Sequence, residues 1–239
     1  MSESNLQERL AVIRERIAAA AARSGRGGDH ITLIAVSKTH SADAIRAAFE
    51  LGIRHFGENR VQEWEGKRSA LHDLQAEWHL VGHLQSNKAA KAARFFHSVD
   101  SADDFALAQR LDRTRSELGE PRTLRVLIEV RIAPEETKSG ITREGLVPLA
   151  EHISALKGLD LQGLMCVPPF LDDPDKVRPY FSELRELKEN LELRLGKKLP
   201  ALSMGMSHDF EVAIEEGATE VRIGTGLFGT RALPPHPTA

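Results

Sequence analysis

The sequence predicts an α/β fold, a single (β/α)8 barrel of the TIM type with an extra helix at its N-terminus. Short apolar runs alternate with segments of helical periodicity, eight such runs can be counted, and the 239 residues come close to the roughly 250 that are typical of this barrel. With a right-handed crossover at each step, eight parallel strands close most simply into a ring. An open doubly wound sheet is the main alternative.

The extra helix comes first in the chain. Apolar residues recur there at helical spacing, at Leu6, Leu10, Ile13 and Ile17. The glycine-rich stretch 24–28 then breaks the pattern. The apolar run 31–36 predicts the first strand, and Ser41 is a suitable N-cap for the helix that follows it.

The same alternation continues along the chain. The remaining predicted strands cover residues 54–56, 78–81, 95–99, 124–130, 161–167, 202–206 and 220–223. Between them, helices are predicted from Asn59, over 86–94, from Ser101, around Leu146, from Pro174 and from Ser207. Ser101 opens a capping-box-like sequence, Ser-x-x-Asp, that ends at Asp104. The fifth and sixth runs are almost continuously apolar, as expected for strands buried on both faces of a parallel sheet.

The composition is that of an ordinary globular protein. Hydrophobic residues make up 41% and charged residues 28%, with a net charge of −3, so we expect no nucleic-acid partner. No apolar run approaches the roughly 18 residues that span a bilayer, so we expect no membrane partner either. The single cysteine, Cys166, can form no internal disulfide, which fits a reducing, cytoplasmic compartment. We expect the barrel to occupy residues 1–232 and residues 233–239 to form a flexible tail.

Lys38 follows directly on the first predicted strand, in the segment Ala35-Val36-Ser37-Lys38-Thr39. The active site of a (β/α)8 barrel is built at the C-terminal ends of its strands. A lysine stem enclosed by the barrel rim would place its amine at the mouth, where desolvation favours the neutral, nucleophilic form. An ordinary solvated lysine is the alternative, and position alone does not exclude it.

A phosphate site is predicted across the closed ring from Lys38, in the loops that follow the seventh and eighth strands. Ser207 begins the predicted helix after the seventh strand, and Gly224-Thr225-Gly226 follows the eighth. These barrels frequently bind phosphate with the loops after strands seven and eight and a short extra helix, which Thr225–Phe228 could supply. Ser207 as a plain helix cap is the alternative.

Gly224-x-Gly226-x-x-Gly229 also matches the dinucleotide-binding fingerprint. Only ten residues follow Gly229, which is too few for the helix, second strand and acidic ribose ligand that this fingerprint requires. We therefore reject a Rossmann-type site.

Other polar residues are expected near the mouth. Asn59 ends the second strand, where it could contact a ligand or cap a helix. His79 and His83 lie four apart, but no neighbouring acid or cysteine completes a metal set, so we expect no metal; His83 is expected to line the mouth. Arg222 lies between Val221 and Ile223 in the last strand, so alternation points it to the opposite face from both.

Together these motifs resemble the YggS/PROSC family of pyridoxal 5′-phosphate (PLP) homeostasis proteins, whose barrel is similar to the N-terminal domain of alanine racemases. The resemblance covers nearly the whole chain. It is carried by Ala35-Val36-Ser37-Lys38-Thr39, Phe56-Gly57-Glu58-Asn59, the segment 78–88, Leu202-Ser203-Met204-Gly205-Met206-Ser207 and Val221-Arg222-Ile223-Gly224-Thr225. One departure is Arg131, where the family usually has asparagine after the fifth strand.

The resemblance implies a role for each matched position. Lys38 would hold PLP as a Schiff base, and Arg222 would approach the pyridine nitrogen and keep it unprotonated, which weakens the ring as an electron sink. Phosphate ligands and pocket neighbours are implied in the same way: Ser207, Gly224 and Thr225 for the phosphate, and Asn59, His83 and Met206 for the rest of the pocket. It also implies a monomer, with PLP-dependent apoenzymes as candidate partners.

Three functions remain open from the sequence. The leading one is a PLP-binding protein that buffers or delivers the cofactor without catalysis. The second is an amino-acid racemase with weak activity, but racemisation needs a base on each face of the substrate, and the only tyrosine, Tyr180, is predicted on an outer helix. The third is a lyase or isomerase without PLP, which the barrel alone supports.

Overall fold

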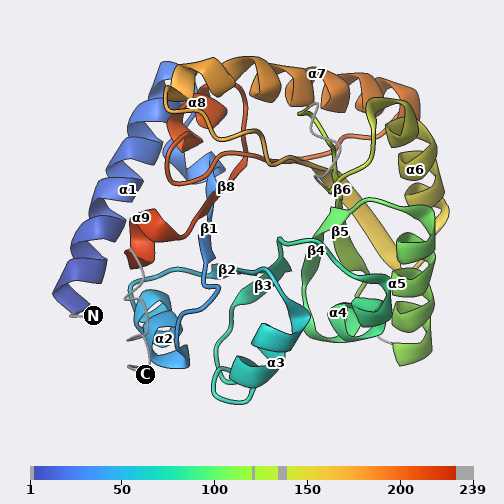
Figure 1. Cartoon of the computed structure of the whole chain (residues 1–239), viewed down its shortest axis with the longest axis horizontal. Helices are drawn as coiled ribbons and strands as arrows, with labels where there is room; N and C mark the ends of the chain where they lie inside the picture. The colour runs from blue at the N-terminus through green and yellow to red at the C-terminus, as the bar shows by residue number, and fades with distance from the viewer. Residues whose placement is uncertain (1–2, 120–121, 134–138, 230–239) are drawn as a thin grey trace, which may run out of the picture.

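The eight strands form a closed parallel barrel in chain order, with the helices packed around the outside (Figure 1). The computed structural model describes residues 3–119, 122–133 and 139–229, so the predicted tail, 233–239, lies outside the described residues. β1 pairs with β2 on one side and with β8 on the other, and Ile34 is the register partner of Arg222. This closure confirms the (β/α)8 barrel and excludes the open doubly wound sheet.

The strands are short, as usual for this barrel. They are β1 (Thr32–Val36), β2 (His55–Glu58), β3 (Glu77–Leu80), β4 (Ser98–Ala102), β5 (Leu124–Glu129), β6 (Leu159–Met165), β7 (Ala201–Ser203) and β8 (Glu220–Ile223). The α-helices are α1 (Glu3–Arg23), α2 (Ala42–Glu50), α3 (Val61–Arg68), α4 (Ala89–Phe95), α5 (Phe105–Leu118), α6 (Arg143–Ala155), α7 (Arg178–Leu195), α8 (Phe210–Glu215) and α9 (Thr225–Phe228). Short 3-10 helices precede β1, α4 and α7; they are η1 (Gly28–His30), η2 (Ser86–Lys88) and η3 (Pro174–Val177).

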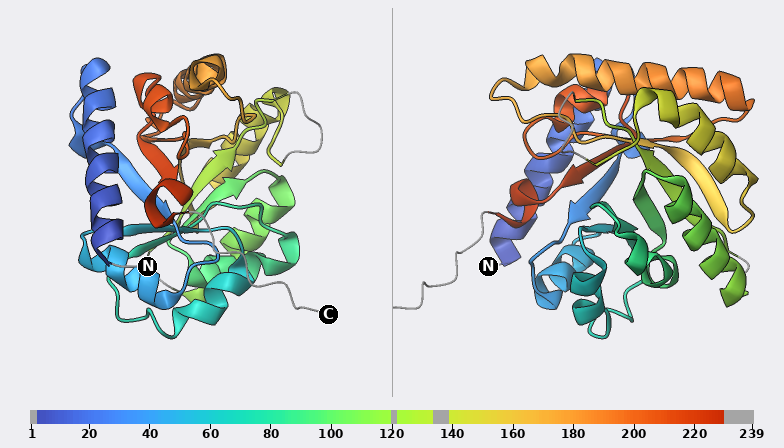
Figure 2. Two further views of the ribbon diagram at one scale, coloured as in Figure 1. Left: turned by 60° about the vertical axis from the view of Figure 1, so that its left-hand side comes forward. Right: turned by 45° about the vertical axis from the view of Figure 1, so that its right-hand side comes forward.

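Helix α1 is the predicted extra helix, and it lies along the outside of the barrel next to α8 and α9 (Figure 2). Its four periodic apolar residues are all buried. Two ion pairs join it to α8, from Arg16 to Glu211 at 2.7 Å and from Arg23 to Glu215 at 2.6 Å. The first helix therefore closes the outer layer beside the last strand.

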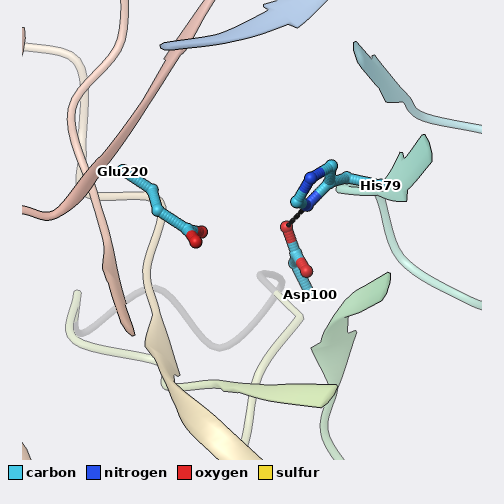
Figure 3. A group of neighbouring side chains, drawn as sticks. All are labelled: His79, Asp100 and Glu220. Carbon is cyan, nitrogen blue, oxygen red and sulfur yellow. Dashed lines mark hydrogen bonds and ion pairs between the residues drawn. The ribbon is translucent and has the colours of Figure 1, made fainter. Parts of the chain in front are cut away.

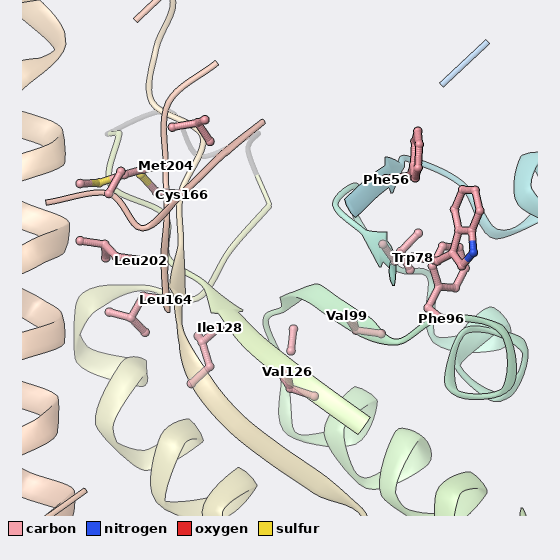
Figure 4. Packing of buried hydrophobic residues seen from close by; sticks show 14 of the residues in the cluster. Phe56, Trp78, Phe96, Val99, Val126, Ile128, Leu164, Cys166, Leu202 and Met204 are labelled. Atoms are coloured by element: carbon pink, nitrogen blue, oxygen red, sulfur yellow. The ribbon is translucent and has the colours of Figure 1, made fainter. Parts of the chain in front are cut away.

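Most of the core lies between the strands and the helix ring (Figure 4). Trp64 of α3 stacks on Trp78 of β3 with ring centroids 3.8 Å apart, and Phe56 of β2 stacks on Trp78 from 5.2 Å. All three rings are buried, and each contributes a large apolar area. This aromatic stack fixes α3 against β2 and β3.

The fourth strand and the helix after it begin later than predicted. β4 starts at Ser98 because α4 continues to Phe95, and the predicted helix start at Ser101 is wrong. The Ser101 hydroxyl lies in β4 and donates to the Gly82 carbonyl at 2.7 Å, while Asp104 caps α5 by accepting the Leu107 N–H at 2.8 Å. Polar residues buried in β4 explain the error, since an apolar run does not mark this strand.

The neighbouring strands β6 and β7 approach each other closely at Gly163. Leu127, Met165 and Ala201 form a small apolar cluster there, separate from the outer core. A Cβ on Gly163 would lie 1.8 Å from the Ala201 carbonyl oxygen. Only glycine lets these two strands approach so closely.

No helix among the described residues is both long and apolar enough to cross a membrane.

Candidate functional site

A cavity of about 610 Å³ opens at the C-terminal ends of the strands. It brings together seven of the residues predicted from the sequence: Lys38, Asn59, Met206, Ser207, Arg222, Gly224 and Thr225. Its volume falls in the range of small-molecule sites. The predicted residues therefore share one site at the mouth expected for this fold.

Lys38 enters the cavity from the loop after β1 and is half-buried. The backbone on both sides of it is tied down, because Ser37 N–H donates to the Gly57 carbonyl at 2.9 Å and Thr39 N–H donates to the Glu63 carboxylate. Among the described residues, no hydrogen bond or ion pair engages the Lys38 amine. The backbone thus holds Lys38 at the cavity, and the described residues leave its amine without a partner.

Arg222 is only 4% exposed and lines the cavity, so it points into the barrel and not outward against a helix, a choice that alternation alone left open. Its guanidinium donates to the Ser203 hydroxyl and to the Cys166 carbonyl, both at 2.8 Å. Both acceptors are neutral, so the cation lines the cavity without a directly bonded carboxylate.

Ser207 lies in a turn, and the prediction that it begins a helix is wrong. α8 begins at Phe210, since the Asp209 carboxylate accepts the Met206 N–H at 2.6 Å and folds residues 206–209 into a turn. The Ser207 hydroxyl accepts the Gly226 N–H at 3.1 Å, which joins the loops after β7 and β8. Among the described residues, the N–H groups of Ser207 and His208 have no acceptor.

The predicted short helix after β8 is confirmed as α9. Its first N–H groups have no partner within the helix. Glycines allow the turn to fit tightly: a Cβ on Gly224 would lie 3.2 Å from the Val36 carbonyl oxygen, and one on Gly226 would lie 3.3 Å from the Ser207 hydroxyl. The loops after β7 and β8 thus form a cradle of backbone N–H groups and one hydroxyl that suits an anion.

The structure places His83 beside this cavity and not in it. Its ring is more than half exposed, and its Nδ1 lies 3.5 Å from the Asp103 carboxylate. His83 lines two neighbouring hollows that also contain Asn59, and one of them includes Arg131. Asn59 is not a helix cap, because Arg60 occupies the N-cap position of α3.

Several cavity residues were not predicted from the sequence. They are Val36, His40, Val81, Val167, Phe170, His208, Asp209 and Gly229. The Phe170 side chain is 73% exposed, and its ring packs against His208 with centroids 5.1 Å apart. Its exposure could not be read from the run of prolines and aspartates around it. Only Asp209 left a signal, as a carboxylate three residues after Met206.

Below the cavity, the barrel is filled by buried polar side chains. His79, Asp100 and Glu220 converge from three strands (Figure 3), with ligand atoms within 4.8 Å of one another. A metal ion could bridge such a group, but Arg125 donates to Glu220 and lies 3.4 Å from Asp100, so a guanidinium already pairs with both carboxylates. We interpret this group as an ion-pair network.

Burial shifts the pKa values of several groups in this network. Desolvation and the nearby His79 lower the pKa of His55 to about 4, so His55 is neutral at pH 7. Burial raises the pKa of Glu220 against the opposing charge of Arg125. For Asp100 burial acts in the same direction, but His79 and Arg125 outweigh it and lower its pKa.

Comparison with known proteins identifies the family. A family model described as the N-terminal domain of alanine racemase matches residues 9–232. The pyridoxal phosphate homeostasis protein of Aquifex aeolicus is 46% identical over 227 residues, which cover 95% of this chain and 99% of that protein. The protein of the same name from Pseudomonas aeruginosa is 45% identical over 228 residues, covering 95% and 96%.

This chain belongs to the pyridoxal phosphate homeostasis protein family. The resemblance seen in the sequence motifs is thereby confirmed. Among solved structures, PipY of Synechococcus elongatus with PLP bound is 40% identical and has a TM-score of 0.83. The superposition covers 94% of this chain and all of PipY. An alanine racemase of Clostridium difficile is 16% identical with a TM-score of 0.73 and shares the fold over 57% of its length.

Tyr180 lies on α7, as predicted, where it packs partly buried against the outer core. It is not among the residues that line the Lys38 cavity.

Proposed function

We propose that this protein binds pyridoxal 5′-phosphate at the barrel mouth, holds it as a Schiff base on Lys38, and takes part in intracellular PLP homeostasis without catalysing a reaction. The observation that carries the proposal is the shared cavity, in which an unengaged lysine amine faces a cradle of backbone N–H groups. PLP carries an aldehyde that can react with the lysine amine and a phosphate that can accept from the backbone N–H groups, so one ligand can engage both groups at once.

The residues present fit this cofactor. Ser207, Gly224 and Thr225 would hold the phosphate, because their backbone N–H groups have no acceptor within the described part of the chain and the glycines leave room for close approach. Asn59 and Met206 would contact the ring from the sides of the cavity. PipY, a relative at 40% identity, has a solved structure with PLP bound, which supports PLP as the ligand of this cavity.

Arg222 is proposed to face the pyridine nitrogen. Its donors are held by Ser203 and Cys166, and a fixed guanidinium beside the nitrogen opposes protonation of that nitrogen. When bound, PLP supplies an electron sink, and this arrangement weakens it. The arginine therefore supports a role in binding and delivery more than in turnover.

Racemisation is the contrasting activity. It would need a second base opposite Lys38, and Tyr180, on the outer helix α7, does not line the cavity. His40 and His208 do line the cavity, so the racemisation assay below tests whether either side chain serves as that second base. We propose a cytoplasmic monomer that passes PLP to apoenzymes; the buried thiol of Cys166 is in keeping with a reducing compartment.

The test combines spectroscopy with site mapping. The purified protein is incubated with PLP, its visible spectrum is recorded before and after borohydride, and the reduced product is mapped by peptide mass spectrometry. We expect a reducible band and a label on Lys38, both absent in Lys38→Ala and retained in Lys91→Ala, which changes an exposed lysine on α4. A wild-type protein without a reducible band would refute binding through a Schiff base, and rapid alanine racemisation by the same sample would refute the non-catalytic role.

A further inference from the structure

Lys38 is flanked by a small cluster of charged side chains that lies outside the cavity. The cluster consists of Glu58 at the end of β2 and Glu63 and Lys67 on α3, and it contacts the residues immediately before and after Lys38. None of its three charged residues lines the Lys38 cavity. The cluster therefore needs an explanation other than ligand contact.

Lys67 is the centre of this cluster. Its ammonium donates to the Ser37 carbonyl at 3.0 Å, to Glu58 at 3.0 Å and to Glu63 at 2.8 Å, so its three protons have three acceptors. The side chain is only 13% exposed and Glu58 is fully buried. Such a shielded, fully bonded ammonium holds its partners in fixed positions.

The two glutamates extend this hold to both sides of Lys38. Glu58 accepts the Ser37 hydroxyl at 2.7 Å, and Glu63 accepts the Thr39 N–H. Thr39 has a φ of 66°, the one positive φ of a non-glycine residue among those described, and this conformation is strained for a β-branched side chain. The bond to Glu63 compensates for that strain at the residue that turns the chain away from the strand.

We propose that Lys67 is a positioning residue that, through Glu58 and Glu63, locks the Ser37–Thr39 backbone and so aims the Lys38 amine into the cavity. The aromatic stack of Trp64 on Trp78 anchors the same helix α3 to the sheet, so the lock rests on a rigid element. The inference rests on the proposed function in one respect, that Lys38 reacts with PLP; the backbone lock itself does not depend on it.

The test uses one disruptive variant and one that repairs its side effect. Lys67→Met removes the cation but leaves Glu58 buried without a counter-charge, so it lowers the melting temperature as well as freeing the backbone. The double variant Lys67→Met with Glu58→Gln removes that buried charge. Glu63→Gln keeps the shape of α3 and weakens both the bond to Thr39 and the ion pair with Lys67, while the Lys67 bonds to Glu58 and to the Ser37 carbonyl remain. Lys91→Met is the matched control, because Lys91 forms an exposed pair with Glu65 at 2.6 Å.

Two readouts follow for each variant: the rate at which added PLP forms a borohydride-reducible bond, and hydrogen exchange at the Thr39 amide in PLP-free protein. We expect Lys67→Met and the double variant to slow bond formation by about 10- to 100-fold, as a misplacement near 1 Å would. The double variant should regain the melting temperature without regaining the rate. Glu63→Gln should speed exchange at Thr39 and slow bond formation, and Lys91→Met should change neither.

Recovery of the rate together with the melting temperature in the double variant would overturn the inference and leave Lys67 a purely structural residue. So would a wild-type rate in both Lys67→Met and Glu63→Gln. A wild-type protein that forms no reducible bond refutes the proposed function instead, and Thr39 exchange then decides the inference alone: faster exchange in Glu63→Gln supports the lock, and unchanged exchange refutes it.

Discussion

Replacing Arg125 with methionine is expected to destabilise the barrel from within. The guanidinium donates to Ser98 at 2.9 Å and joins Asp100 to Glu220 across the interior. Methionine preserves much of the side-chain volume and removes the charge. Two carboxylates, one fully buried and the other 10% exposed, then face each other without their shared cation.

The magnitude follows from the burial of the group. Removing one partner of a buried ion pair costs about 3–5 kcal/mol, and because Arg125 is itself 22% exposed we expect the lower end, about 3 kcal/mol. At about 2–4 °C for each kcal/mol in a chain of this size, the melting temperature should fall by about 6–12 °C. That loss is a large fraction of the roughly 5–15 kcal/mol by which domains are stable.

The deficit should shrink in acid. Burial already raises the pKa of Glu220 above its ordinary value of 4.5, and loss of Arg125 raises it further. A carboxyl whose pKa is higher in the folded state takes up protons on folding, so its contribution to stability grows as the pH falls through the folded pKa toward 4.5. The difference in melting temperature between Arg125→Met and the wild type should therefore be smaller at pH 5 than at pH 8.

Thermal unfolding followed by circular dichroism at both pH values measures this effect. Arg113→Met is the control, because it breaks an exposed pair with Glu117 on α5 and should leave the melting temperature almost unchanged. Glu220→Gln added to Arg125→Met should recover part of the loss. A melting temperature equal to the wild type, or an equal deficit at both pH values, would refute the account of the network.

Three further predictions concern other parts of the chain. Gly163→Ala should lower the free energy of unfolding in urea by more than about 3 kcal/mol, because its Cβ would overlap the Ala201 carbonyl. Gly66→Ala, at an open position on α3, should raise that free energy by up to about 1 kcal/mol. A Gly163→Ala variant as stable as the wild type would contradict the close packing of β6 on β7. Cys166 should resist thiol reagents at pH 8 until the protein unfolds, since burial raises its pKa to about 12, and fast labelling of the native protein would disprove this. Gly226→Ala should weaken phosphate binding about tenfold in equilibrium dialysis, because the added methyl group displaces Ser207; Gly66→Ala is the control. Equal phosphate affinity in Gly226→Ala and the wild type would refute the proposed phosphate site.

Much of the fold could be predicted because strands and helices alternate along the chain. The eighth strand was predicted with its observed bounds, and Ser41 caps α2 as expected. Pro174 begins the 3-10 helix η3, so the α-helix α7 starts four residues later than predicted, at Arg178. The fourth strand was misplaced for a physical reason. Asp100 and Ser101 are both buried, and Arg125 and the Gly82 carbonyl provide their polar partners, so burial there does not require an apolar sequence.

The site was predictable where a residue directly follows a strand. Lys38 and Gly224 occupy such positions, and strand closure alone brings them to one mouth. His83 follows a strand too, but its pairing with Asp103 holds it at the adjoining hollows. Phe170 and His208 reach the cavity through longer loops, and loop paths depend on contacts that the local sequence does not contain.

The last strand, β8, places charged side chains at two levels of the barrel. Two positions earlier on the same strand, Glu220 neutralises Arg125, so the lower barrel contains its own counter-charges. Arg222 is held by a hydroxyl and a carbonyl, which fix its direction without cancelling its charge. A cation buried in this way is poorly screened by water. Burial raises the pKa of the Asp209 and Glu129 carboxyls, and the nearby charge of Arg222 opposes that rise, so acidic groups already lie around this cation. One strand therefore stabilises the barrel with Glu220 and presents Arg222 at the cavity, where the proposed function places the pyridine nitrogen.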